Sequence, residues 1–270
     1  MSASIDIHWT PELRYLLRLA DTCLISGQRL GEWCGHAPVL EEDIALTNMA
    51  LDLIGQSRAL LTLAGQVEAR GRATPAASAY DEDQLAFLRD ERDYLNPTLV
   101  ELPNGPGQPG DFALTVVRNL MVSTCLKLWW ERLADSSEAE LAAIAGKALK
   151  EARYHQQHAG DWLVRLGDGT PESRHRAEAA LARLWPYHAE LFDADAADAA
   201  AQASGLGPSV AALKEPWLAE MGAWLDEATL ATPPDSRFLS TGRRGVHSEH
   251  LGYILAEMQH LQRAYPGGAW

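Results

Sequence analysis

The stretch KALKEARYHQQHAGDW, residues 147–162, contains the pattern on which the fold prediction depends. On a helix, Glu151, His155 and His158 fall at i, i+4 and i+7, so they share one face. A carboxylate and two imidazoles on one face indicate either part of a metal site or a polar helix surface. The residues on the neighbouring helices distinguish these alternatives.

Composition restricts the class of protein. The chain has 270 residues, of which 47% are hydrophobic and 22% charged, as in ordinary soluble globular proteins. Its net charge of −14, without a run of Lys or Arg, argues against nucleic acid and anionic membrane as partners. No apolar run approaches the roughly 20 residues of a membrane span, and the N-terminus does not look like a secretory signal. Because the three cysteines are far apart, we expect thiols in a reducing cytoplasm.

Helical periodicity predicts four long helices, at residues 11–33, 40–69, 111–134 and 137–166. Thr10 and Pro11 are suited to the cap and first turn of the first helix, and Asp111 to the cap of the third. The third helix is nearly apolar all round, which is typical of a fully buried helix. Four such helices predict a helical bundle.

Shorter helices are predicted at residues 82–94, 171–192, 209–230 and 246–265. Residues 98–102 lie between Pro-containing turns and are predicted to be extended, and the alanine-rich residues 193–204 are predicted to connect two helices. No segment has the alternating period of a strand. We therefore predict an all-α fold, a four-helix bundle with additional C-terminal helices, in a single domain over residues 1–270.

Bundles that use carboxylates and histidines in chemistry include the di-iron proteins, which take a Glu from each of two helices and a Glu-x-x-His from each of the other two. The helix at 137–166 nearly has this motif, but His155 comes one residue late after Glu151, a rotation of about 100°. The second helix has no histidine, and Asp52 or Gln56 is the degenerate counterpart. Between Phe112 and Trp130 the third helix has no carboxylate.

These departures predict a polar centre that has lost its metals, with no metal ligand and no catalytic residue in this chain. Its members are predicted to be Asp21, Asp52, Gln56, Arg118, Glu151 and His155. The guanidinium of Arg118, in an otherwise apolar helix, is expected to compensate the buried carboxylates. The alternative is an independently active ferritin-like di-iron oxidase or oxygenase.

Several blocks of sequence together carry a family resemblance: GQRLGEWCGHAP (27–38), LDLIGQSRALL (51–61), FLRDERDYLN (87–96), KEARYH (150–155), ELFDAD (190–195) and residues 247–270. Over essentially the whole chain they resemble the phenylacetyl-CoA epoxidase family, the ring 1,2-epoxidases of aerobic phenylacetate degradation, and in particular its structural, C-type subunits. The resemblance implies a ferritin-like bundle and a non-catalytic subunit of an oxidoreductase, which alone is inactive.

The resemblance also implies partners and cofactors. The catalytic A subunit carries the di-iron centre, binds the structural subunit and acts on phenylacetyl-CoA with dioxygen. A reductase subunit supplies electrons from NADPH, and accessory subunits complete a higher-order assembly. No cofactor is implied for this chain itself.

A charged cluster precedes the turn at Pro97 and is the candidate for contact with bound phenylacetyl-CoA. Arginine can bind phosphate, and tyrosine and asparagine can bind or stack on a nucleotide. The candidates are Arg92, Asp93, Tyr94, Leu95 and Asn96. The alternative is that internal ion pairs of the cluster, which begins at Arg89, only hold a loop in place.

Residues 247–270 form the candidate surface for the A subunit or for a second copy, because aromatic and polar side chains are typical of contact patches. The candidates are His247, Glu249, His250, Tyr253, Glu257, His260 and Trp270. Glu257 and His260 form an intact Glu-x-x-His, but no second such motif is expected on a facing helix. A solvated C-terminal helix is the alternative.

Overall fold

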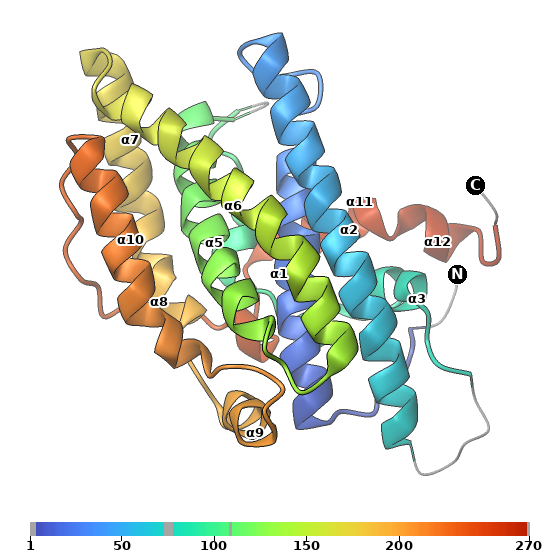
Figure 1. The fold of residues 1–270 in the computed structure, drawn as a ribbon. Helices are drawn as coiled ribbons and strands as arrows, with labels where there is room; N and C mark the ends of the chain where they lie inside the picture. The colour runs from blue at the N-terminus through green and yellow to red at the C-terminus, as the bar shows by residue number, and fades with distance from the viewer. Residues whose placement is uncertain (1–3, 73–77, 108–109, 269–270) are drawn as a thin grey trace.

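Four long helices form the body of the computed structural model, which describes residues 4–72, 78–107 and 110–268. They are α1 (Pro11–Gly31), α2 (Leu40–Gly71), α5 (Phe112–Leu133) and α6 (Ala139–Gly167). Helix α1 packs along α2 and α5 along α6, while α2 and α6 lie together at the front of the bundle (Figure 1). The described residues contain no strand. The predicted all-α bundle is confirmed.

The helix starts follow from local capping. The Thr10 hydroxyl accepts a hydrogen bond from the amide of Leu13, and Pro11 occupies the first turn of α1. The Asp111 carboxylate accepts from the amides of Ala113 and Leu114 at the start of α5. The caps predicted at Thr10 and Asp111 are therefore confirmed.

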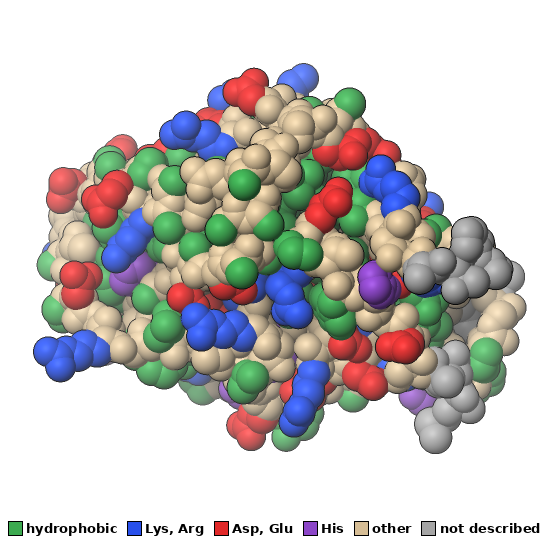
Figure 2. All heavy atoms as spheres, turned by 90° about the horizontal axis from the view of Figure 1, so that it is seen from below, with side chains coloured by type: hydrophobic (Ala, Val, Ile, Leu, Met, Phe, Trp, Pro, Cys, Tyr) green, Lys and Arg blue, Asp and Glu red, His purple; other side chains and the backbone are tan. Residues whose placement is uncertain are grey.

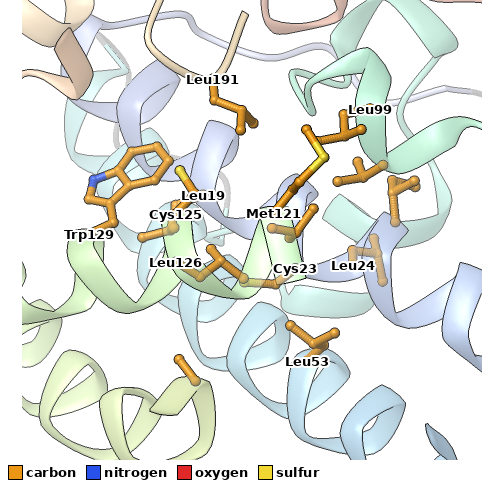
Figure 3. Close-up of a cluster of buried hydrophobic side chains, with 14 of the residues drawn as sticks. Leu19, Cys23, Leu24, Leu53, Leu99, Met121, Cys125, Leu126, Trp129 and Leu191 are labelled. Carbon is orange, nitrogen blue, oxygen red and sulfur yellow. The ribbon is translucent and has the colours of Figure 1, made fainter. Parts of the chain in front are cut away.

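Helix α5 is the centre of the core. Its Met121, Cys125 and Leu126 meet Cys23 of α1 and Leu53 of α2 in one apolar cluster (Figure 3). By length and composition, α5 is the one described helix that could cross a membrane, contrary to the expectation from the sequence. However, 89% of its most apolar window is buried inside the protein, as in the core helix of a soluble protein.

The remaining helices are shorter and cover the bundle. They are α3 (Glu82–Phe87), α4 (Thr98–Glu101), α7 (Pro171–Leu184), α8 (His188–Leu191), α9 (Ala196–Ser204), α10 (Lys214–Glu227), α11 (Glu249–Met258) and α12 (His260–Ala264). Single 3-10 turns are η1 (Glu91–Asp93), η2 (Trp185–Tyr187), η3 (Val210–Leu213) and η4 (Gly242–Arg244). Helices α7 to α10 lie on one side of the bundle, and α11 and α12 on the other (Figure 1).

Several predicted boundaries are wrong. The helix expected at 82–94 ends at Phe87, and residues 98–102, predicted to be extended, contain α4. The expected helix at 171–192 is interrupted at η2, which contains Pro186, because proline has no amide hydrogen to continue the helical ladder. The helix expected at 246–265 divides at Gln259.

The alanine-rich segment also differs from its prediction, since it forms α9. The Asp195 carboxylate accepts from the amide of Ala197, and Asp198 completes a capping box. Gly205 then ends the helix with φ at +76°, a conformation that glycine adopts without strain. Alanine has the highest helix propensity of all residues, so the alanine-rich sequence between these two caps forms a helix.

A buried ionic network attaches the C-terminal half to α1. Arg18, 1% exposed, donates to Asp195 and Asp198 of the α9 start and to the carbonyl of Arg243. Hydrogen bonds from the Arg18 guanidinium lower the pKa of Asp195. The amide of Arg243 donates to Glu190 Oε1 at 2.7 Å. Segments far apart in sequence are therefore held on one helix by charge-assisted bonds.

Candidate functional site

Four residues of the predicted polar centre meet where α2 and α6 adjoin. Gln56 Nε2 donates to Glu151 Oε2 at 2.9 Å, and His155 Nε2 lies 3.1 Å from Asp52 Oδ2. The Cys23 thiol reaches Gln56 Oε1 at 3.6 Å, the range of a sulfur hydrogen bond. These contacts join α2 to α6 through polar side chains within hydrogen-bonding distance of one another.

The other two predicted members lie elsewhere. Asp21 pairs with Arg89, both side chains being fully buried, and it also accepts from the amide of Leu95 at 2.9 Å. Arg118 donates to the Leu102 carbonyl at 2.5 Å and to Asn104. The expectation that Arg118 neutralises the carboxylates is therefore wrong.

The physical reason is that the segment after α3 packs onto the bundle and supplies its own partners to α1 and α5. Asp21 is therefore paired with the Arg89 guanidinium. Arg118 donates to the uncharged oxygens of Leu102 and Asn104 and not to a carboxylate. Burial, and secondly the nearby charge of Arg29, lower the pKa of Arg118 to about 9.

These residues do not fit a di-iron centre. The interior carboxylates already have other partners, since Asp21 binds Arg89 and Glu151 accepts from Gln56. Apolar side chains such as Leu53 and Leu126 fill the space between the helices (Figure 3). Within the described part of the chain, no group of three or more His, Cys, Asp or Glu side chains is placed to hold a metal. The metal-free state itself stays a prediction.

The candidate substrate residues are mostly inaccessible. Tyr94, Leu95 and Asn96 are buried at 1% exposure or less. The Tyr94 hydroxyl donates to the Ala86 carbonyl at 2.5 Å, and burial raises the pKa of Tyr94 to about 12. No ligand reaches these three side chains in this arrangement, which agrees with the alternative of an internally fixed loop.

The other two candidate substrate residues are more accessible to solvent. The side chain of Arg92 is exposed and that of Asp93 is half-buried, so a contact between substrate and these two residues stays a prediction.

Only some of the residues predicted to form the C-terminal contact surface are exposed. Glu249, Tyr253, Glu257 and His260 are exposed, and His250 is half-buried. Trp270 lies outside the described residues. The side chain of His247 has no exposure, so its predicted place in a contact patch is wrong.

His247 instead joins the start of the C-terminal segment to the loop below it. Its Nε2 is 2.8 Å from the Tyr94 carbonyl, and its Nδ1 is 3.2 Å from Glu101 Oε2, an ionic contact rather than an aligned hydrogen bond. Burial lowers the pKa of His247, but the Glu101 carboxylate, the Tyr94 carbonyl and the more distant Asp21 raise it, and the net shift is upward from 6.5.

This pairing predicts a pH-dependent contribution to stability. Because the folded-state pKa of His247 is raised, its stabilisation is complete below pH 6.5 and is lost as the pH rises through the folded pKa. We expect His247→Gln to reduce the free energy of unfolding more at about pH 6 than at about pH 9, with a slope of at most about 1.4 kcal/mol per pH unit. Urea titrations of both proteins measure this, and a pH-independent difference would contradict it.

Comparison with known proteins assigns the chain to a family. A family model described as phenylacetic acid catabolic protein matches residues 2–270. The chain belongs to this family. Its members have a ferritin-like fold, so the bundle of α1, α2, α5 and α6 is the ferritin-like core expected from the sequence.

A relative within the phenylacetic acid catabolic protein family supports the match along the whole chain. It is the C subunit of the 1,2-phenylacetyl-CoA epoxidase of Escherichia coli strain K12. The two are 46% identical over 256 residues, which cover 95% of this chain and 98% of the relative. The resemblance predicted from the sequence is confirmed.

Proposed function

We propose that this chain is the structural, non-metal-binding subunit of a 1,2-phenylacetyl-CoA epoxidase, and that it binds and supports the catalytic subunit of this di-iron monooxygenase. The observation that carries the proposal is the pairing of the interior carboxylates with Arg89 and Gln56 in a chain 46% identical to a C subunit. Asp21 is neutralised by the Arg89 guanidinium in the core, and one oxygen of Glu151 is engaged by the Gln56 amide, so neither carboxylate is free for a metal.

The chain acts in this proposal as a rigid partner. The Gln56–Glu151 bond and the His155–Asp52 contact hold α2 to α6 where ferritin-like enzymes place ligands. The iron and the oxygen chemistry belong to the catalytic subunit, electrons come from NADPH through a reductase subunit, and accessory subunits complete the assembly. The complex is cytoplasmic and acts on phenylacetyl-CoA.

Iron content is the first test of the proposal. After incubation of the purified chain with ferrous iron and desalting, we expect far less than one iron per chain, because no complete ligand set lies in the described part of the bundle. Elemental analysis gives the ratio, and the catalytic subunit treated in the same way is the positive control. A ratio near two would favour the independently active di-iron oxidase.

Activity completes the test. Epoxidation by the catalytic subunit with its reductase should require this chain, whereas the chain with reductase alone should be inactive. A catalytic subunit that is soluble and fully active by itself would remove the proposed role.

A further inference from the structure

Helices α11 and α12 lie at the edge of the bundle, and α12 projects away from it (Figure 1). The main contacts of α11 outside this pair of helices are with α4 and η1, not with the four long helices. Its residues Leu251, Ile254 and Leu255 are buried, but a hollow of about 440 Å³ is lined by residues of both η1 and α11, among them Glu91 and Gly252. Elements with little packing against the core open at a lower free energy than the core itself.

The chain enters these helices through a fixed point and a hinge. The fixed point is Arg243, whose amide donates to Glu190 Oε1 at 2.7 Å. Gly245 follows with φ at +75°, and a side chain there would collide with the Arg92 carbonyl oxygen. Backbone rotation during a hinge motion is absorbed by a few residues between packed elements, often small ones. Residues 246–264 can therefore move as a unit about Gly245.

His247 attaches this unit to the body just beyond the hinge. Its Nε2 lies 2.8 Å from the Tyr94 carbonyl oxygen, and its Nδ1 lies 3.2 Å from Glu101 Oε2. Both partners are acceptors, so only the imidazolium presents a proton to each of them. The amide of Ser248 donates to Glu101 Oε1 at 3.0 Å. Two successive residues of the unit are thus bound to one buried carboxylate.

The charges around Glu101 make this attachment depend on the proton. Within the described part of the chain, the contact with His247 is the one ion pair of the Glu101 side chain. Arg29 of α1 donates to the main-chain carbonyl of Glu101 and not to its carboxylate. Asp21, which also faces His247 from α1, is already paired with Arg89. Loss of the His247 proton therefore leaves the Glu101 charge buried without a counter-ion, which is costly.

The attachments further along the unit do not change charge near neutral pH. Gln259 Nε2 donates to the Arg89 carbonyl at 3.0 Å and to the Tyr94 hydroxyl at 2.9 Å. Arg263 Nη2 donates to the same Arg89 carbonyl at 2.9 Å. Glutamine has no proton to lose, and arginine keeps its charge. Of these attachments, the His247 contact alone responds to a change of pH between 6 and 9.

The charge of the whole protein acts in the same direction but less selectively. The net charge is −14, and Figure 2 shows carboxylates spread over one face among side chains of other types. A diffuse negative field favours the protonated form of every histidine. A histidine of the same unit that is exposed, His260, therefore separates this general effect from that of the Glu101 pair.

We propose that residues 246–264 form a lid that the proton on His247 holds closed. When the imidazole is neutral, the lid opens about Gly245 and uncovers Glu101 together with the apolar face of α11. The raised pKa of His247 agrees with this sign, because its stabilisation is complete below pH 6.5 and is lost as the pH rises through the folded pKa. The lid is a property of this chain alone and does not depend on the proposed function.

Hydrogen exchange of the full chain, corrected for the intrinsic rate at each pH, tests the lid. The opening constant of the α11 amides should rise severalfold between pH 6 and pH 8.5, by at most about tenfold per pH unit, the limit for one proton. At each pH it should exceed that of the α5 amides at least about 100-fold, because the lid opens without the core. His247→Gln should open more than the unmodified chain at pH 6 and lose the dependence on pH. His260→Gln, the matched control, should keep it.

Two results from the unmodified chain would overturn the proposal, whether or not the variants fold. Equal opening constants for α11 and α5 would mean that the unit opens only when the whole protein unfolds. An α11 opening constant independent of pH would mean that no proton controls it. Glu101→Gln should also abolish the dependence on pH, and a Glu101→Gln chain that retained it would show that Glu101 is not the partner that holds the lid closed.

Discussion

Replacing Asp21 by asparagine is expected to lower the free energy of unfolding by about 3–5 kcal/mol, because it leaves the guanidinium of Arg89 charged and unpaired in the core. Both side chains are completely buried. Asp21 also accepts from the Leu95 amide at 2.9 Å, and Arg89 also donates to the Asp93 carbonyl at 2.9 Å. The pair therefore attaches the 88–96 segment to α1, and urea unfolding followed by circular dichroism measures its loss.

An exposed ion pair provides the matched control. Arg153 and Glu131 are 59% and 33% exposed and lie 3.2 Å apart, so Glu131→Gln should cost no more than about 1 kcal/mol. If Asp21→Asn costs no more than this control, the Arg89 pair does not determine the stability of the fold.

Trp217→Ala should have an effect of similar size. Trp217 has no exposure, stacks on His188 with ring centroids 5.4 Å apart, and packs against Trp185 and Phe192. Its indole Nε1 donates to the Met121 carbonyl at 2.9 Å, which ties α10 to α5. Removing the ring leaves a large cavity, and we expect a loss of about 3–5 kcal/mol, measured by chemical denaturation.

Two further variants separate packing from general effects of aromatic loss. Trp217→Phe keeps most of the ring and removes the indole hydrogen bond, so it should cost less than the alanine variant. Tyr253→Ala removes an aromatic ring that is 68% exposed and should stay within about 0.5 kcal/mol of the unmodified chain. A Trp217→Ala cost as small as that of Tyr253→Ala would contradict the assignment of Trp217 to the core.

The long helices were predictable because their determinants are local. The periodicity of α1 and α5, with caps at Thr10 and Asp111, lies within each segment and needs no knowledge of the rest of the chain. The apolar composition of α5 likewise predicted its burial.

The short helices depend on distant residues or on caps that are easily overlooked. The first amide of α4, that of Thr98, donates to Glu190 Oε2 at 2.8 Å, a partner 92 residues away. Helix α9 was missed although Asp195 and Asp198 form a capping box at its start. In the first case no local pattern could reveal the helix, whereas in the second the signal was present in the sequence.

The polar centre was predicted only in part for the same reason. Gln56 and Glu151 lie on long helices whose pairing follows from the bundle, so their proximity could be inferred. Asp21 and Arg118 bind residues of the irregular segment between α3 and α5, and the position of that segment is decided by tertiary packing. A buried charge in an apolar helix indicates that a partner exists, but not which one.

The attachment of Arg18 has a consequence for synthesis of the chain. Arg18 lies in the first helix, but its partners follow 177, 180 and 225 residues later. At roughly 5–20 residues per second, the ribosome needs about 10–45 s to make the intervening chain. Through this interval the guanidinium has none of its final partners, so α1 cannot reach its final environment until the last part of the protein has emerged. Folding of this bundle is therefore completed after translation of its C-terminal segment rather than helix by helix.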